Sequence, residues 1–171
     1  MPPGSGTVMA IRSGRARRGM EMVLFIGAQG AGKSRFYLDR FFATHVRVNL
    51  DMLKTRHRER LLLRACFEMK QHFVVDNTNP TRDERAAYIV QAREHGFAVR
   101  GYYFDVPYDD LLSRNAQREG KARVPEVAIR ATLKRLQPPA WAEGFEQLYT
   151  VQVRDGGCIV TDYESESEGV R

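Results

Sequence analysis

The stretch that decides the fold is Gly27-Ala28-Gln29-Gly30-Ala31-Gly32-Lys33-Ser34. It fits the phosphate-loop pattern G-x-x-x-x-G-K-[S/T] at every fixed position, between an apolar run and a helical pattern. Glycines let such a loop curl so that its backbone N–H groups face phosphates, and the following helix adds the positive end of its dipole. The pattern predicts that these eight residues bind ATP, that Lys33 reaches the β- and γ-phosphates, and that Ser34 ligates Mg²⁺. The alternative is a glycine-rich turn that binds nothing, which the surrounding strand and helix disfavour.

Outward from this loop, strand-like and helix-like patterns alternate. Apolar runs predict strands at residues 22–26, 45–49, 72–76, 97–105, 147–153 and 158–160. Helical patterns cover residues 33–42, 56–70, 81–94 and 108–117, and a last helix opens at Pro125. Thr81 and Glu84 form a capping-box pattern at one of these starts. Strands that alternate with helices predict an α/β fold with a parallel sheet.

Charge divides the chain of 171 residues into a body and two tails. Residues 1–19 carry four arginines and no acid, and residues 162–171 carry four acids and one arginine, so we expect both to be disordered. For the N-terminal tail, a transit peptide and a nucleic-acid-binding arm are alternatives to a segment without function. The body, residues 20–161, keeps a formal charge of +5, which suits a polyanionic partner.

Composition also limits the setting of the protein. No apolar run is long enough to span a bilayer, so the sequence predicts no membrane partner. The two cysteines, Cys66 and Cys158, lie far apart without metal-ligand spacing, and both are typical of thiols in a reducing compartment. We therefore expect a cytoplasmic location. The sequence does not predict the oligomeric state.

Two aspartates follow predicted strands, where ligands of an α/β sheet bind. Asp51 lies just beyond strand 45–49, and a carboxylate there can accept the proton of an acceptor hydroxyl during phosphoryl transfer. Capping of the following helix is an equally supported role for Asp51. Asp76 ends an apolar run in the Walker-B pattern, which predicts that it holds Mg²⁺ or its water. Asp76 can also start the polar turn that follows, and the two roles are compatible.

A basic segment late in the body predicts a lid. Arg114 and Arg118 are four residues apart, so they share one face of a predicted helix. Residues 119–125 connect this helix to the next one. A helix–loop–helix of this kind can close over ATP and place arginines on the transferring phosphoryl group. A solvated basic face is the alternative, but glycine and proline flank the loop and favour the lid.

These segments resemble the 5′-kinase domain of polynucleotide kinases, such as those of bacteriophages and of animal DNA-repair kinase/phosphatases. The resemblance covers about residues 22–153, and its phosphate loop is shared with many ATPases. Its more specific segments are Val46-Arg47-Val48-Asn49-Leu50-Asp51, Val75-Asp76-Asn77-Thr78-Asn79-Pro80 with Arg85, Arg114-Asn115 with Arg118 and Val124-Pro125, and Trp141-Ala142-Glu143-Gly144-Phe145.

The resemblance implies catalytic roles for three residues. Asp51 stands at the place of the family's general base, which favours that role over helix capping. Arg118, with Arg114 beside it, stands at the place of the lid arginines that bind the phosphates. With Lys33 of the phosphate loop, Asp51 and Arg118 form the expected catalytic set.

The resemblance also implies an acceptor side. In the family, the segment that matches Asp76, Thr78, Asn79 and Arg85 lines that side of the cleft. Lys54 stands where the phage-type enzymes have an arginine that grips the acceptor phosphate, and a lysine lacks the bidentate fork of an arginine. The sequence contains no Asp-x-Asp phosphatase motif, so we expect no phosphatase activity from this chain.

We therefore expect residues 20–161 to form a three-layer α/β sandwich of the P-loop kinase type, with a parallel five-stranded sheet and a helical lid. The predicted reaction is transfer of the γ-phosphoryl group of ATP, with Mg²⁺, to the 5′-OH end of DNA or RNA. A kinase of a metabolite, nucleoside or nucleotide-sugar hydroxyl is the first alternative. An ATP-dependent switch or binding module is the second, although a switch needs neither a hydroxyl base nor lid arginines.

Overall fold

The computed structural model describes residues 19–154 and 157–164. In these ranges the strands and helices follow one another as β1 (Glu21–Ile26), α1 (Lys33–Arg40), β2 (Val46–Val48), α2 (Leu50–Leu53), α3 (Arg56–Met69), β3 (Phe73–Val75), α4 (Arg82–Glu94), β4 (Ala98–Phe104), α5 (Tyr108–Ala116), η1 (Gly120–Ala122), α6 (Glu126–Arg135), η2 (Trp141–Glu143), β5 (Gln147–Arg154) and β6 (Gly157–Asp162). The capping box at Thr81 and Glu84 is present at the start of α4. The short helix α2 was not predicted.

One sheet holds the six described strands in the order β2-β3-β1-β4-β5-β6. The first five are parallel, as predicted, and β6 pairs antiparallel with β5. Only two residues separate β5 from β6, and a parallel crossover needs a dozen or more, so β6 can only return beside β5. The α/β fold of the P-loop kinase type is confirmed, with one antiparallel edge strand added.

The side chains of β1 point alternately to the two faces of the sheet, and each face is covered by helices, which gives the three layers. Met22, Leu24 and Ile26 are buried in a core that α3 and α4 complete on one face of the sheet. Val23 and Phe25 are buried in a second core, which α1, α5 and α6 complete on the other face. A parallel sheet buried on both faces needs such continuous apolar strands.

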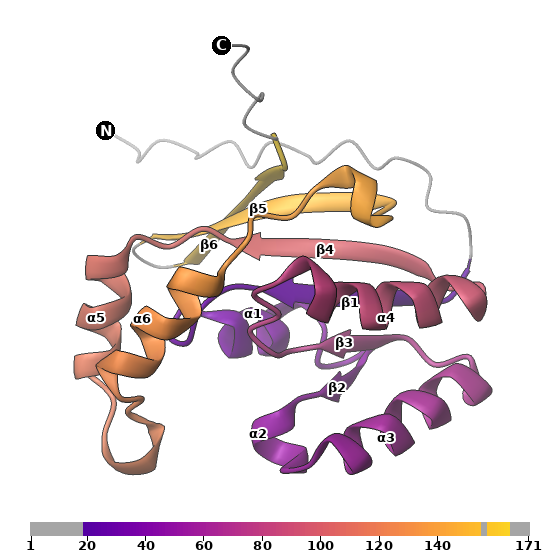
Figure 1. The fold of residues 1–171 in the computed structure, drawn as a ribbon, viewed down its shortest axis with the longest axis horizontal. Helices are drawn as coiled ribbons and strands as arrows, with labels where there is room; N and C mark the ends of the chain where they lie inside the picture. The colour runs from indigo at the N-terminus through magenta and orange to yellow at the C-terminus, as the bar shows by residue number, and fades with distance from the viewer. Residues whose placement is uncertain (1–18, 155–156, 165–171) are drawn as a thin grey trace, which may run out of the picture.

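The carboxyl ends of the parallel strands meet at one edge of the sheet. In Figure 1, the arrow of β4 points toward this edge, and α5 and α6 lie together there. The predicted helix–loop–helix is therefore present next to the strand ends. Asn115, which is buried, ties its loop down: Nδ2 donates to Val124 O at 2.7 Å, and Val124 N donates to Asn115 Oδ1 at 2.9 Å.

The predicted tails lie almost wholly outside the described residues, at 1–18 and 165–171. At the C-terminal side, β6 runs through Asp162, and Tyr163 N donates to Leu148 O at 3.0 Å. The folded region therefore continues slightly beyond residue 161. Among the helices described, none combines the length and apolar character that crossing a membrane would require.

Candidate active site

The phosphate loop lies between the end of β1 and the start of α1. Gly32 has a φ of 93°, and a Cβ there would lie 3.1 Å from Val153 Cγ2. A Cβ on Gly27 would lie 2.9 Å from the Cβ of Phe104. The loop is thus packed against the ends of β4 and β5 so closely that both glycines are required.

The loop fits an anion. Among the described residues, the backbone N–H groups of Gly30, Gly32 and Lys33 donate to no backbone acceptor, and they lie at the start of α1. Lys33 Nζ donates to the carbonyl oxygens of Gly27 and Ala28 at 2.8 and 2.7 Å. Burial lowers the pKa of Lys33 to about 8, an effect that Arg118 strengthens and that Asp76 and Asp51 oppose. A polyphosphate beside Lys33 would supply the negative charge that this buried ammonium lacks.

A cavity of about 540 Å³ opens beside this loop. Its lining combines the phosphate loop with the ends of β2 and β3 and the loop after α5: Gln29, Gly30, Gly32, Lys33, Ser34, Arg35, Leu38, Asn49, Leu50, Asp51, Asp76, Asn77, Thr78, Arg118 and Val124. All three predicted catalytic residues therefore face one space. The buried Oε1 of Gln29 has no hydrogen-bond partner among the described residues, as expected where a ligand completes the site.

Asp51 lies in the first turn of α2, but it is not the cap of that helix. The cap is Asn49, whose side-chain oxygen accepts a bond from Met52 N at 3.0 Å and whose Nδ2 donates to Asp76 O. Asp51 is exposed to the cavity, and no hydrogen bond or ion pair between described residues uses its carboxylate. The capping alternative is removed, and the carboxylate is available to an incoming hydroxyl.

Ser34 and Asp76, the predicted metal ligands, lie close together. Both contact the same nitrogen, Nη2 of Arg47, which lies 2.8 Å from Ser34 Oγ and 2.6 Å from Asp76 Oδ2. Asp76 is almost fully buried, with 2% of its side chain exposed. A hydroxyl and a carboxylate that share one cation are suitable ligands for Mg²⁺, so the residues present fit the metal that the phosphate loop implies.

Two predicted acceptor contacts are wrong. Arg85 is fully buried and forms a bidentate pair with Glu143, at 2.7 and 2.8 Å, and it also donates to the carbonyl oxygens of Asn79 and Pro80. Asn79 is 4% exposed and donates to Phe25 O at 2.7 Å. Both side chains hold the turn after β3 onto the rest of the fold, because buried polar groups need partners. Neither lines the cavity.

The remaining predicted residues differ in position. Thr78 lines the cavity, and its carbonyl accepts from Gly27 N at 3.0 Å. Lys54 is exposed at the end of α2, outside the cavity lining. Arg114 Nη2 donates to Val153 O at 3.2 Å, so this arginine reaches the end of β5, whereas Arg118 reaches the cavity. The two arginines predicted for a lid therefore lie at different places.

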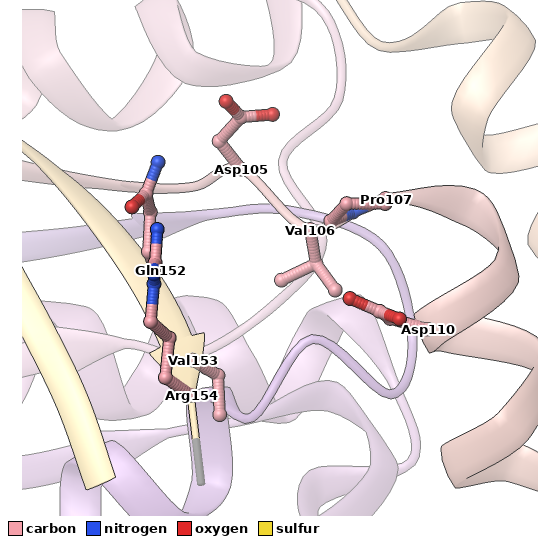
Figure 2. Close-up of a pocket in the computed structure, with 7 residues that line it drawn as sticks. All are labelled: Asp105, Val106, Pro107, Asp110, Gln152, Val153 and Arg154. Atoms are coloured by element: carbon pink, nitrogen blue, oxygen red, sulfur yellow. The ribbon is translucent and has the colours of Figure 1, made fainter.

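A smaller cavity of about 300 Å³ lies between the segment after β4 and the end of β5. Figure 2 shows Asp110 of α5 on one side of it, and Gln152 and Arg154 of β5 on the other. Asp105, Val106, Pro107 and Val153 complete its lining. Because Val153 also touches the position of Gly32, this cavity lies next to the phosphate loop.

Arg47, which contacts both Ser34 and Asp76, was not among the predicted site residues. It lies in β2 between Val46 and Val48, and the alternation of that strand was a signal that a charged side chain leaves the core there. The resemblance marked Asn49 only as part of the matched Asn-x-Asp segment. Its capping role had a signal too, since asparagine is among the preferred caps.

The fold and the site define this protein as a nucleotide-binding P-loop domain of the kinase type. Residues 22–139 match a family model described as an AAA domain, and the chain belongs to that family. A relative, the bifunctional polynucleotide phosphatase/kinase of Schizosaccharomyces pombe, is 28% identical over 148 residues, which is 84% of this chain and 35% of that protein. The chain thus spans about a third of the length of this relative.

Solved structures share the fold. A gluconokinase from Sinorhizobium meliloti superposes with a TM-score of 0.55 at 20% identity, covering 80% of this chain and 85% of that one. The AvrRxo1-ORF1:-ORF2 complex with ATP gives a TM-score of 0.65 at 14% identity, covering 84% of this chain and 57% of that one. At such identities the likeness concerns the fold alone.

Proposed function

We propose that this chain is an ATP-dependent phosphotransferase whose acceptor is the 5′-OH end of a nucleic acid. The observation that carries the proposal is the position of Asp51. Its carboxylate has no partner among the described residues, and it faces the cavity that Lys33 and Arg118 also line. A base for a hydroxyl, and two cations for phosphates, thus share one space.

The proposed reaction exchanges one P–O bond for another. The acceptor oxygen bonds to the γ-phosphorus, the bond to the β–γ bridging oxygen breaks, and Asp51 takes the proton of the hydroxyl. Lys33 and Arg118 neutralise charge on the phosphates, and the free N–H groups of Gly30 and Gly32 orient them. Mg²⁺, held by Ser34 and Asp76, would draw charge from the phosphate oxygens.

The smaller cavity supports a place for the nucleoside of ATP. Its lining residue Val153 lies 3.1 Å from a Cβ placed on Gly32, so a nucleotide whose phosphates fill the loop would direct its base there. Val106, Pro107 and Val153 offer apolar surface to a ring, and Arg114 reaches the same strand end. The nucleoside would then occupy a cavity whose lining shares no residue with the one that Asp51 lines.

Two considerations support a nucleic-acid acceptor. One is the likeness to a relative named as a polynucleotide phosphatase/kinase. The other is the basic body, with Arg35 in the cavity lining and Lys54 exposed near Asp51. The burial of Arg85 favours the rival, a small hydroxyl acceptor, because it removes one cation expected to grip a polyanion.

The test is transfer of labelled phosphate from ATP to a 5′-OH oligonucleotide, a nucleoside and a sugar acid, each at two salt concentrations. We expect the oligonucleotide to be preferred, and its binding to weaken with salt at a log–log slope of roughly −0.7 per phosphate contact. Asp51→Asn protein purified in parallel controls for a contaminating kinase. Preference for the small acceptors, without salt dependence, would leave only the general kinase assignment.

A further inference from the structure

Arg47 places one guanidinium between the two predicted metal ligands. Its Nη2 contacts Ser34 Oγ at 2.8 Å and Asp76 Oδ2 at 2.6 Å, and its Nε contacts the same Oδ2 at 2.8 Å. The guanidinium carbon lies 5.5 Å from the centre of the Tyr37 ring. One side chain from β2 therefore connects α1 to the residue that follows β3.

The chemistry of these contacts makes Arg47 and a metal ion competitors. Arginine stays protonated in proteins, so it supplies the positive charge that the buried Asp76 carboxylate needs. Ser34 Oγ accepts the Arg47 bond through a lone pair, and a metal ion would bind through a lone pair of that oxygen as well. A guanidinium and a divalent cation cannot both occupy the space between these two oxygens.

We propose that Arg47 is a positioning residue that acts as a resident cation at the metal position. It holds Ser34 and Asp76 together when no metal is bound, and Mg²⁺ must displace it before it can reach both oxygens. The side chain is 30% exposed, so it has an open route away from the pair. This inference rests on the proposed function, because it takes Ser34 and Asp76 as the ligands.

The central measurement uses calorimetry of ADP binding at increasing Mg²⁺ concentrations. It gives the Mg²⁺ concentration at which half of the Mg²⁺-dependent increase in ADP affinity is reached. Removing the competing charge with Arg47→Gln should lower this concentration, by roughly tenfold for a competing interaction of about 1.4 kcal/mol. The matched control is Arg100→Gln. Arg100 is also a half-buried strand arginine, 23% exposed and paired with Glu21 at 3.0 Å, but Glu21 starts β1 at the opposite end of that strand from the phosphate loop. The control should keep the wild-type requirement.

Arg47→Lys gives a second variant with the charge retained. A lysine offers one point contact in place of the fork, so it should lower the Mg²⁺ requirement by a smaller factor than Arg47→Gln. This variant decides the question if Arg47→Gln does not fold. A requirement that stays at the wild-type value or rises would overturn the proposal, since Arg47 would then support the metal-bound state.

A metal-only arm separates this inference from the proposed function. Wild-type protein that binds no ADP, with or without Mg²⁺, would refute the proposed function. The nucleotide-free proteins are therefore also titrated with Mn²⁺ and followed by electron paramagnetic resonance. Tighter Mn²⁺ binding by Arg47→Gln than by wild type and Arg100→Gln supports the resident cation, whereas equal or weaker binding overturns it.

Discussion

The phosphate loop and the segment after β3 lie side by side at the same edge of the sheet, yet their polar residues have different roles. In the loop, Lys33 and Ser34 face the large cavity, as their motif predicts. After β3, Asp76 also faces the cavity, but Asn79 and Arg85 turn inward and are saturated by protein partners. The named side chains of the phosphate loop line the cavity, whereas those of the segment after β3 divide between the cavity and the interior.

The difference lies in what each motif specifies. The phosphate-loop pattern describes a backbone conformation, in which glycines and the start of a helix determine where the N–H groups point. A matched Arg85 or Asn79 specifies only a side-chain type, and a long or amide side chain can turn either toward a ligand or toward the interior. The available partners determine the direction of the side chain. Arg85 turns inward because it pairs with Glu143, which is 58 residues away in the chain.

The largest effects should separate the donor and acceptor sides of the cavity. Lys33→Ala should reduce phosphoryl transfer on the order of a hundredfold or more and should also weaken ATP binding, because it removes the ammonium from a buried site. Asp51→Asn should reduce transfer by roughly 10²–10⁴-fold and leave ATP binding nearly unchanged, because it removes only the proton acceptor. Turnover and ATP affinity are measured for both.

These two variants check each other. Both proteins should keep the wild-type thermal midpoint without nucleotide, which shows that they are folded. Near-normal turnover by Asp51→Asn would place the base elsewhere. Normal ATP affinity in Lys33→Ala would mean that the phosphates do not sit in this loop.

A second, smaller effect should distinguish a structural Arg85 from an acceptor-binding one. Arg85→Met leaves the Glu143 carboxylate, which is 10% exposed, without its bidentate partner. Breaking such a buried pair should lower the free energy of unfolding by about 3–5 kcal/mol. The KM for the acceptor should change little at temperatures where the variant is folded. Denaturant unfolding and acceptor titrations give the two numbers.

The double variant Arg85→Met with Glu143→Gln sharpens this result. Neutralising the carboxylate removes most of the penalty of an unpaired buried charge, so part of the lost stability should return. A stable Arg85→Met with a raised acceptor KM would restore the original prediction that Arg85 grips the acceptor.

The same reasoning shows how much the sequence could predict. The strands, the helix starts and the phosphate loop follow from period, caps and glycine positions, which are local properties. Asp51 and Arg118 line one cavity because the parallel strands end at one edge of the sheet and the loop after α5 lies beside that edge. The antiparallel direction of β6 could also have been inferred, because the predicted strands 147–153 and 158–160 leave a connection far too short for a parallel crossover.

What the sequence could not predict depends on contacts between distant residues. Arg85 is in α4, and its partner Glu143 is in η2. Arg47 of β2 contacts Ser34 of α1 and Asp76, which follows β3. The separation of Arg114 from Arg118 depends on where the helix ends: α5 stops at Ala116, so Arg118 leaves the helical face that the spacing implied. Helix ends are set by a few local contacts and are hard to place from sequence.

The smallest expected effect concerns pH and returns to the donor side. Burial lowers the pKa of Lys33 from 10.5 to about 8 in the nucleotide-free protein, although Asp76 and Asp51 oppose this shift. Bound phosphates would raise that pKa again, because they add negative charge beside the ammonium. Above pH 8, nucleotide binding should therefore take up a proton, and affinity should fall as pH rises.

The size of this effect follows from linkage. At pH 7 the nucleotide-free protein already carries the Lys33 proton, whereas at pH 9 about a tenth of the molecules do, so ADP affinity should fall about tenfold between these values. Calorimetry in two buffers of different ionisation enthalpy gives both the affinity and the proton uptake. Lys33→Arg is the control, since an arginine stays charged across this range and should bind ADP without the decline. Equal affinities at pH 7 and pH 9 in the wild type, without proton uptake, would mean that Lys33 keeps its ordinary pKa and that burial in the loop does not weaken its charge.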